Sequence, residues 1–339
     1  MTERHTELIY SNNTLMHLQS KQNFESEVYN ITHPILRIDI ADLTPKIFFE
    51  KYRKTSTPVI ITGLLKDESD WTLDYLCEKL GNQKFVFRNY GSARYKQDKR
   101  NWKSIGSGVD LQIMSFSEFA ELMRSGKARE NDINLGKHPL KNTPLADNLS
   151  LTSIGEKLGL KKSVTHLNIY VNPAGHSSGL HYDSVDGTLM QMHGSKKVVL
   201  FPPSQTNNLY PFPFYIHLFY GMKMRCWFSK VNVENPDFTS FPKFKEALQH
   251  RHEAILNLGE TLFIPEGWWH DVTALGDEMV CAVNRFWRVY PISRVLLSRS
   301  RWRAVLGMIC ALPHILFNFA TVAFSRDRKQ KFSKISHRL

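Results

Sequence analysis

Apolar residues recur in short runs through the second half of the chain, and their pattern predicts strands. Clear runs occur at residues 167–171, 196–201, 261–264 and 280–286, and Pro, Gly and Asn separate them. Short strands without long helices between them favour an antiparallel barrel or sandwich. One insertion, residues 204–252, interrupts the pattern with aromatic residues and prolines. The second half is therefore expected to be mainly β.

The first half mixes strand and helix patterns. Strands are expected at residues 35–40, 58–63 and 84–87, because apolar residues alternate there or form a short buried run. Helices are expected after Thr44-Pro45, over 71–80 and over 115–125, where Ser115 and Glu118 resemble a capping box. Surface loops are expected at residues 90–110 and 137–148, and residues 1–30 read as a flexible N-terminal arm.

The C-terminal tail has a different pattern, a mostly apolar run over residues 305–324 with arginines on both sides. Its length permits a membrane span, but Pro313, His314 and Asn318 argue against a helix that faces lipid. Two other interpretations stay open. The tail could form helices that join two copies of the chain, or its basic residues could contact an anionic membrane surface.

Composition and charge support a globular protein. The chain has 339 residues, 42% hydrophobic and 22% charged, which suffices for a buried core. The net charge is +12, but eleven Lys and Arg against one acid fall after residue 287, so residues 1–287 carry only +2. Nucleic acid is therefore an unlikely partner of the main domain.

Two local features predict a cytoplasmic protein, with membrane association through the tail as an alternative. The four cysteines, Cys77, Cys226, Cys281 and Cys310, are widely spaced and include no C-x-x-C motif, as expected of free thiols in a reducing compartment. The first 25 residues are polar and lack the apolar segment of a secretory signal.

The candidate chemistry lies at His181, Asp183 and His270. Side chains at positions i and i+2 of a strand share one face, so His181 and Asp183 can converge, and His270 follows another strand pattern. Two imidazoles and a carboxylate with open positions suit non-haem Fe(II). Zinc held by three protein ligands is the competing metal, and three hydrogen-bonded core residues are the plain structural alternative.

Three further residues are candidates for binding a cosubstrate. Lys196 begins the strand pattern after Asp183 and could pair with the far carboxylate of a dicarboxylate. Ser178 could add a hydroxyl donor, and Asn284 could place an amide near the metal.

A set of motifs follows one order along about residues 35–290: upstream Pro58-Val59-Ile60-Ile61-Thr62-Gly63 with Trp71, then Gly179-Leu180-His181-Tyr182-Asp183, Gly194-Ser195-Lys196-Lys197-Val198-Val199-Leu200-Phe201-Pro202-Pro203, Leu209-Tyr210-Pro211-Phe212-Pro213, Asn235-Pro236-Asp237-Phe238, Phe241-Pro242-Lys243-Phe244, Gly259-Glu260-Thr261-Leu262-Phe263-Ile264-Pro265 and Trp268-Trp269-His270. This ordered set resembles the JmjC/cupin-type Fe(II)- and 2-oxoglutarate-dependent oxygenases, and is especially similar to the branch of the factor-inhibiting-HIF asparaginyl hydroxylase.

The resemblance implies a double-stranded β-helix (cupin or jelly-roll) barrel with flanking and C-terminal helices. It implies iron held by His181, Asp183 and His270, and 2-oxoglutarate anchored by Lys196, with Ser178 where the family often has Thr. It also implies O2 as oxidant, ascorbate as a supporting reductant, and a homodimer through the C-terminal helices. Two positions depart from the family pattern. Gly187 stands where relatives commonly carry an Asn, and Asn134 is the nearest match to a cosubstrate-binding Tyr.

These observations predict three regions and one function. The regions are a flexible arm (1–30), an oxygenase domain (31–290, with the barrel core at about 165–290) and a basic and apolar helical tail (291–339). The expected function is a dioxygenase that hydroxylates a side chain in a protein or peptide. The alternatives are a catalytically silent binding or scaffold protein, or an oxygenase acting on a small molecule or an N-methyl group.

Overall fold

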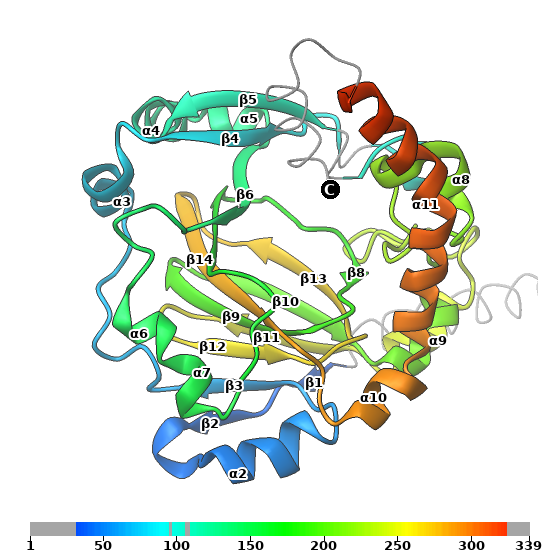
Figure 1. Cartoon of the computed structure of the whole chain (residues 1–339), viewed down its shortest axis with the longest axis horizontal. Helices are drawn as coiled ribbons and strands as arrows, with labels where there is room; N and C mark the ends of the chain where they lie inside the picture. The colour runs from blue at the N-terminus through cyan, green and yellow to red at the C-terminus, as the bar shows by residue number, and fades with distance from the viewer. Residues whose placement is uncertain (1–31, 95–96, 106–108, 324–339) are drawn as a thin grey trace, which may run out of the picture.

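The computed structural model describes residues 32–94, 97–105 and 109–323, and the predicted N-terminal arm lies outside these ranges. The described chain is rich in β-structure. One sheet has five strands in the order β1-β11-β10-β13-β8, and the other has nine in the order β2-β3-β12-β9-β14-β7-β6-β4-β5. Helices flank the sheets, and a long C-terminal helix runs along one side of the molecule (Figure 1).

Eight consecutive strands, β7 to β14, build the barrel. Four of them, β7, β9, β12 and β14, are neighbours in the larger sheet, and β8, β10, β11 and β13 are neighbours in the smaller sheet. All pairings among them are antiparallel. This arrangement confirms the predicted jelly-roll, or double-stranded β-helix, fold. The strands are β7 (Asn168–Pro173), β8 (His181–Tyr182), β9 (Asp186–His193), β10 (Lys196–Phe201), β11 (His252–Leu256), β12 (Thr261–Ile264), β13 (Trp269–Ala274) and β14 (Met279–Trp287).

Strands from the first half of the chain extend both sheets. The strand β1 (His33–Pro34) joins the smaller sheet, and β2 (Arg37–Asp39) and β3 (Val59–Thr62) join one edge of the larger. The strands β4 (Lys84–Asn89), β5 (Asp110–Ser115) and β6 (Ile133–Pro139) form its other edge.

The expected loop at 137–148 was wrong in its first three residues, because they continue β6. His138 pairs with Ile169, and Pro139 pairs with Asn168. The register shifts between Leu135 and His138, and Lys137 in this irregularity has a positive φ of 52°. Irregularities of this kind redirect side chains, and their local pattern differs from simple alternation.

Helices of the first half begin close to their predicted positions. Thr44 caps α2 (Pro45–Phe48), which continues as a π-helical turn η2 (Phe49–Arg53). The predicted capping box is present, since Ser115 and Glu118 cap each other's backbone at α4 (Phe116–Arg124). The remaining segments of this half are η1 (Ile40–Asp42), α3 (Leu73–Leu80), η4 (Lys99–Asn101), α5 (Lys127–Glu130), α6 (Leu149–Thr152) and α7 (Ile154–Lys157).

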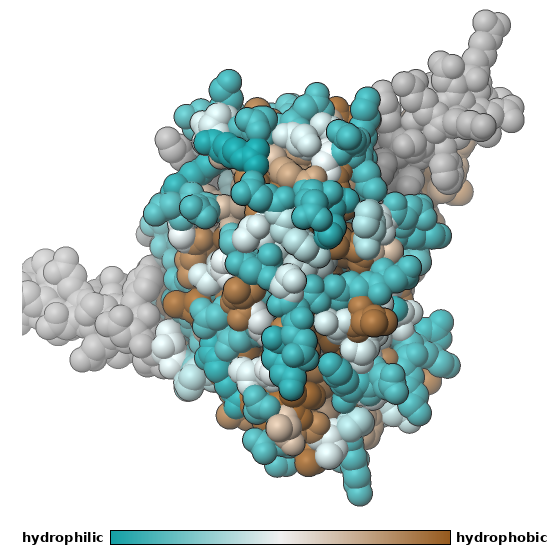
Figure 2. Space-filling model, turned by 90° about the vertical axis from the view of Figure 1, so that its left-hand side faces the viewer, coloured by the Kyte–Doolittle hydropathy of each residue, from teal (hydrophilic) through white to brown (hydrophobic). Residues whose placement is uncertain are grey.

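Apolar clusters hold these layers together. The largest joins residues of α3 and α4, such as Leu76 and Phe116, to Ile169 and Val283 of the larger sheet. A second lies between the two sheets and includes Leu200 and Leu262. Burial of such side chains stabilises the fold by roughly 1.5–3 kcal/mol each. On the face toward α3, α4, α6 and α7, apolar residues are scattered among hydrophilic ones (Figure 2).

The insertion and the tail form the opposite side of the molecule (Figure 1). The insertion folds as η5 (Pro203–Leu209), α8 (Ile216–Tyr220), η6 (Gly221–Lys223) and α9 (Phe244–Leu248). The tail forms α10 (Ile292–Leu297) and α11 (Arg299–Ala323). Helix α11 includes Pro313, packs on α8 and η6, and is long and apolar enough to cross a membrane by length and composition.

Candidate metal centre and its cavity

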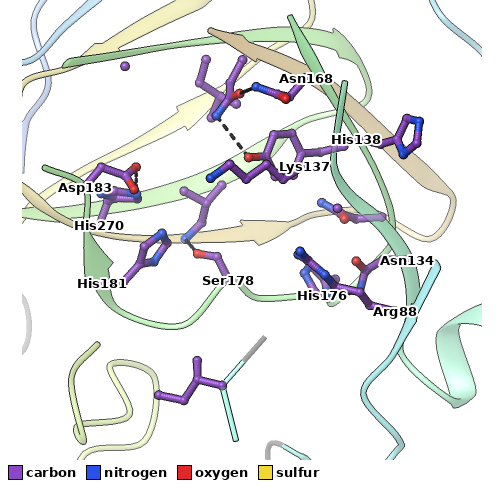
Figure 3. Close-up of a pocket in the computed structure, with 18 of the residues that line it drawn as sticks. Arg88, Asn134, Lys137, His138, Asn168, His176, Ser178, His181, Asp183 and His270 are labelled. Carbon is purple, nitrogen blue, oxygen red and sulfur yellow. Dashed lines mark hydrogen bonds and ion pairs between the residues drawn. The ribbon is translucent and has the colours of Figure 1, made fainter. Parts of the chain in front are cut away.

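The three predicted ligands meet at one end of the barrel. His181 pairs with His270 across β8 and β13, and Asp183 follows β8 directly. One potential ligand atom from each residue lies within 4.8 Å of the other two. The distance from His270 Nε2 to Asp183 Oδ2 is 3.6 Å. The structure thus brings together the three side chains singled out from sequence (Figure 3).

Backbone carbonyls orient both imidazoles. His181 Nδ1 lies 2.8 Å from the carbonyl oxygen of Gly179, and His270 Nδ1 lies 3.0 Å from that of Trp268. A carbonyl can only accept, so each Nδ1 carries the proton, and each Nε2 keeps a free lone pair. The His181 ring also stacks on Phe228 with a centroid distance of 4.7 Å.

The electrostatics of the site keep His181 neutral. Burial, followed by the neighbouring His270, lowers the pKa of His181 to about 3. A metal ligand must be deprotonated at the donor atom, so this imidazole is ready to coordinate at neutral pH. Two nitrogens and a carboxylate oxygen, without a cysteine in the cluster, fit Fe(II) as a facial triad.

The triad opens into a cavity of about 470 Å3 between the two sheets. Lys196 of β10 lines this cavity, with its side chain only 3% exposed. Its Nζ lies 5.9 Å from the centre of the Tyr170 ring. Burial lowers the pKa of Lys196 to about 8, so the ammonium still carries its charge at neutral pH. The predicted cationic anchor therefore faces the same space as the three candidate metal ligands.

Ser178 and Asn284 also line the cavity, in agreement with their predicted place. The Ser178 hydroxyl accepts a hydrogen bond of 3.0 Å from the Val272 amide and donates a longer one of 3.4 Å to the carbonyl of Gly179. Asn284 Nδ2 donates to the Tyr170 hydroxyl at 3.2 Å, and its Oδ1 accepts from Asn168. Asn284 is thus part of a polar network on the cavity wall.

Tyr170 was missed from sequence, and it supplies a tyrosine where none had been assigned. It lies on β7 between Asn168 and Asn172, and all three line the cavity. Their spacing of two residues was the available signal, because polar side chains at i, i+2 and i+4 share one face of a strand. Burial raises the pKa of Tyr170, so its hydroxyl stays protonated.

The two positions that depart from the family pattern also face the cavity. A Cβ added to Gly187 would lie 3.5 Å from the Phe286 ring, an ordinary contact, so the cavity has room for a side chain there. Asn134 lies 3.4 Å from His176 Nδ1 through its amide nitrogen. Figure 3 shows Asn134 and His176 together on the wall opposite the triad.

Three cations of the cavity wall were also missed: Arg88 of β4, Lys137 of β6 and Arg225, which follows η6. They come from three distant parts of the chain. The irregularity in β6 sets the position of Lys137, and Arg225 belongs to the insertion that sequence alone did not place.

Comparison with known proteins identifies the family. The family described as "Cupin-like domain" matches residues 45–291, which is most of the chain. In Arabidopsis thaliana, Lysine-specific demethylase JMJ31 is 32% identical over 58% of this chain and 34% of its own length. Lysine-specific demethylase JMJ30 of the same organism is 31% identical over 71% of this chain and 52% of its own length.

A third relative matches over a larger share of its length. The tRNA wybutosine-synthesizing protein 5 of Gallus gallus is 33% identical over 76% of this chain and 79% of its own length. The first two relatives are matched over only a third to a half of their length. The jelly-roll topology, the matched residues and these relatives lead to one conclusion: the chain belongs to the cupin-like family of JmjC-type proteins.

Proposed function

We propose that this chain is an Fe(II)- and 2-oxoglutarate-dependent dioxygenase that hydroxylates its substrate. One observation carries the proposal. Two imidazoles with free Nε2 atoms and one carboxylate converge within 4.8 Å, on the wall of a cavity that also contains the buried cation of Lys196. A silent scaffold would have no need of this donor set beside a buried ammonium.

The side chains of such a site would have separate roles. His181, Asp183 and His270 would hold iron and leave positions open, and Lys196 would pair with the far carboxylate of 2-oxoglutarate. The Ser178 hydroxyl would donate to the same carboxylate in place of its 3.4 Å hydrogen bond to the Gly179 carbonyl. When bound, the iron would couple oxidation of the substrate by O2 to decarboxylation of 2-oxoglutarate, which yields succinate and CO2.

The substrate proposed is a side chain of a protein or peptide. A cavity of about 470 Å3 falls in the range of sites that enclose small groups, roughly 300–1,000 Å3. It can therefore take a cosubstrate and a single side chain, while the rest of a peptide stays outside. The names of the relatives include a lysine-specific demethylase and a tRNA wybutosine-synthesizing protein, so an N-methyl group and a tRNA base are the alternatives.

Succinate release tests the proposal. Purified protein with Fe(II), ascorbate and 2-oxoglutarate should release succinate above the no-enzyme blank, and peptides from cell lysate should stimulate the release. The variant His181→Ala should fall to the blank, because one metal ligand is lost, whereas His250→Ala, on the surface, should match the unchanged chain. Release equal to the blank with every lysate fraction would contradict the proposal.

The competing zinc site gives a different result. A zinc enzyme would retain zinc tightly on isolation and would work without 2-oxoglutarate. Metal analysis of the isolated protein, together with activity measured with and without the cosubstrate, separates the two.

A further inference from the structure

The cavity wall carries more positive charge than the proposed metal and cosubstrate can neutralise. Its charged lining residues are five cations and one carboxylate, namely Arg88, Arg94, Lys137, Lys196, Arg225 and Asp183. Arg94 is paired, because Asp132 lies 3.7 Å from its guanidinium. A divalent metal, its ligand Asp183, the two carboxylates of 2-oxoglutarate and Lys196 balance to zero. Arg88, Lys137 and Arg225 are left over.

These three cations have no protein counter-ion in the part of the chain that the structure describes. No carboxylate of residues 32–94, 97–105 or 109–323 lies within 4.0 Å of their charged nitrogens. Arg225 Nε is also buried without a hydrogen-bond partner. Burial, followed by repulsion from the charge of Arg88, lowers the pKa of Arg225 to about 10, so Arg225 stays charged at neutral pH. Figure 3 shows Lys137 between the triad and His138 of β6. Arg88 and Arg225 are half-buried, and unpaired charges removed from water are costly unless a ligand compensates them. Lys137 is exposed at the cavity wall.

The aromatic rings of the cavity lie beside protein cations or an imidazole. Each of four rings has a protein cation near it: Arg94 over Tyr90 at 3.7 Å, Lys196 over Tyr170 at 5.9 Å, Arg225 over Trp227 at 5.8 Å and Lys137 over Phe286 at 5.5 Å. The fifth, Phe228, stacks on His181. A methylammonium group is bound by aromatic faces, and here each of these rings already has a cation or an imidazole beside it.

We propose that the substrate group entering this cavity is an anion, a carboxylate or a phosphate, which Arg88, Lys137 and Arg225 bind beside the metal. The inference rests on the proposed function and narrows it, because it disfavours a protonated methyl-lysine, which these cations would repel. Arginine guanidinium groups match both anions with paired N–H donors, and Lys137 adds a point charge. Charge complementarity of this kind selects among substrates of equal size.

Equilibrium binding tests the inference without turnover. The full chain, loaded with Mn(II) and saturating 2-oxoglutarate, is titrated calorimetrically with N-acetyl-aspartate amide, N-acetyl-asparagine amide, N-acetyl-phosphoserine amide and N-acetyl-dimethyl-lysine amide. The better of the two anionic probes should bind at least about tenfold more tightly than the neutral one, because hydrogen bonds to charged groups contribute roughly 1.5–3 kcal/mol. The tighter anion identifies the class. Equal affinity for the aspartate, phosphoserine and asparagine probes, or tightest binding of the dimethyl-lysine probe, would overturn the inference.

Variants of the cavity residues test whether the preference for an anionic probe arises in the cavity. Arg88→Gln and Arg225→Gln should each reduce the preference for the anion to about threefold or less, while the Kd of 2-oxoglutarate changes by no more than about twofold. Arg225→Lys should retain most of the preference, which guards against a folding defect. Arg129→Gln removes one exposed cation whose partner Asp277 is also exposed, and should change neither affinity. If the cavity variants weaken 2-oxoglutarate as much as the anionic probe, these arginines serve the cosubstrate and the inference is wrong.

The same titrations separate two failures. If 2-oxoglutarate does not bind the unchanged chain, the proposed function itself is contradicted. If 2-oxoglutarate binds but no preference for an anion is found, only this inference is contradicted.

Discussion

The cavity and helix α11 both leave side chains without protein partners, but of opposite kinds. In the cavity, the half-buried cations of Arg88 and Arg225 lie without counter-ions among the described residues. On α11, large apolar side chains are exposed to solvent, among them Ile309 (55%), Leu316 (65%) and Phe317 (69%). Charge removed from water and apolar surface left in water both cost free energy. The first region therefore fits a polar ligand, and the second fits an apolar partner.

The largest effect is expected at the ion pairs that attach the tail to the barrel. Asp186 of β9 is fully buried and lies 3.0 Å from Arg294 of α10 and 3.5 Å from Arg53. Asp186→Asn leaves two arginines unpaired and should lower the free energy of unfolding by about 3–5 kcal/mol. Urea denaturation measures this change.

A surface pair provides the control. Asp74 lies 2.7 Å from Arg124, but its side chain is 88% exposed. The same change, Asp74→Asn, should cost no more than about 1 kcal/mol. Similar losses for the two variants would show that the pairs of Asp186 do not anchor the tail.

The cosubstrate anchor should give the next largest effect. Lys196→Met keeps an apolar stem in the cavity but removes the buried ammonium. The Kd of 2-oxoglutarate should rise about 10- to 150-fold, equivalent to the 1.5–3 kcal/mol of a hydrogen bond to a charged group. Lys197→Met is the neighbouring control, since Lys197 instead contacts Glu234 at 3.1 Å. Calorimetric titration with Mn(II) present measures both, and an unchanged Kd for Lys196→Met would remove Lys196 from the site.

The pH dependence of the same affinity tests the charge of this lysine. Its pKa is lowered to about 8 by burial, so the free protein holds the ammonium below pH 8 and loses it above. Affinity for 2-oxoglutarate should be constant between pH 6.5 and 7.5, and should fall above pH 8 by up to about tenfold per pH unit. Lys196→Met should show no such fall. A fall of equal size in that variant would assign the effect to another group.

A smaller effect is expected where α11 approaches the insertion. A Cβ on Gly307 would lie 2.7 Å from Cys226 Sγ and 2.9 Å from His217, and both side chains are buried. The strain should outweigh the gain in helix propensity, so Gly307→Ala should destabilise the fold by about 1 kcal/mol. The exposed neighbour Leu306 offers the control Leu306→Ala, which should change thermal unfolding little. A higher Tm for Gly307→Ala would show that α11 is loosely seated.

The smallest effect on stability is expected on the exposed face of α11. Phe317→Ser should change the free energy of unfolding by no more than about 0.5 kcal/mol. We propose that this face joins two copies of the chain, so the variant should shift the sedimentation coefficient toward a monomer. A monomer for the unchanged chain, together with flotation on anionic liposomes at low salt, would favour the membrane surface instead.

The sequence was sufficient to predict those candidate site residues that lie within short motifs or clear strand patterns. His181 and Asp183 are two residues apart near one short strand, and the strand patterns around Lys196 and His270 placed them in the same barrel. The periodicity of apolar residues and the order of the motifs were enough to predict these positions. The family-level expectation is confirmed, and the specific likeness to the asparaginyl hydroxylase branch stays a prediction.

The parts that sequence did not give depend on three-dimensional detail. Arg88, Lys137 and Arg225 meet only because β4, β6 and the insertion close over one end of the barrel, and Lys137 depends on an irregular strand. Tyr170 was visible as one of three alternating polar residues, but that pattern resembles any half-exposed strand. The proposed regions 1–30, 31–290 and 291–339 remain predictions.

The first turn of α11 is attached directly behind the candidate metal ligands. Tyr182, which separates His181 from Asp183, donates a hydrogen bond of 3.0 Å to the carbonyl of Ser300. Arg301 donates one of 3.0 Å to the carbonyl of Ser184, the residue after Asp183. Binding free energies at two linked places are reciprocal. A partner that alters metal affinity through this turn would therefore itself bind more tightly or more weakly, by the same factor, when the metal is loaded.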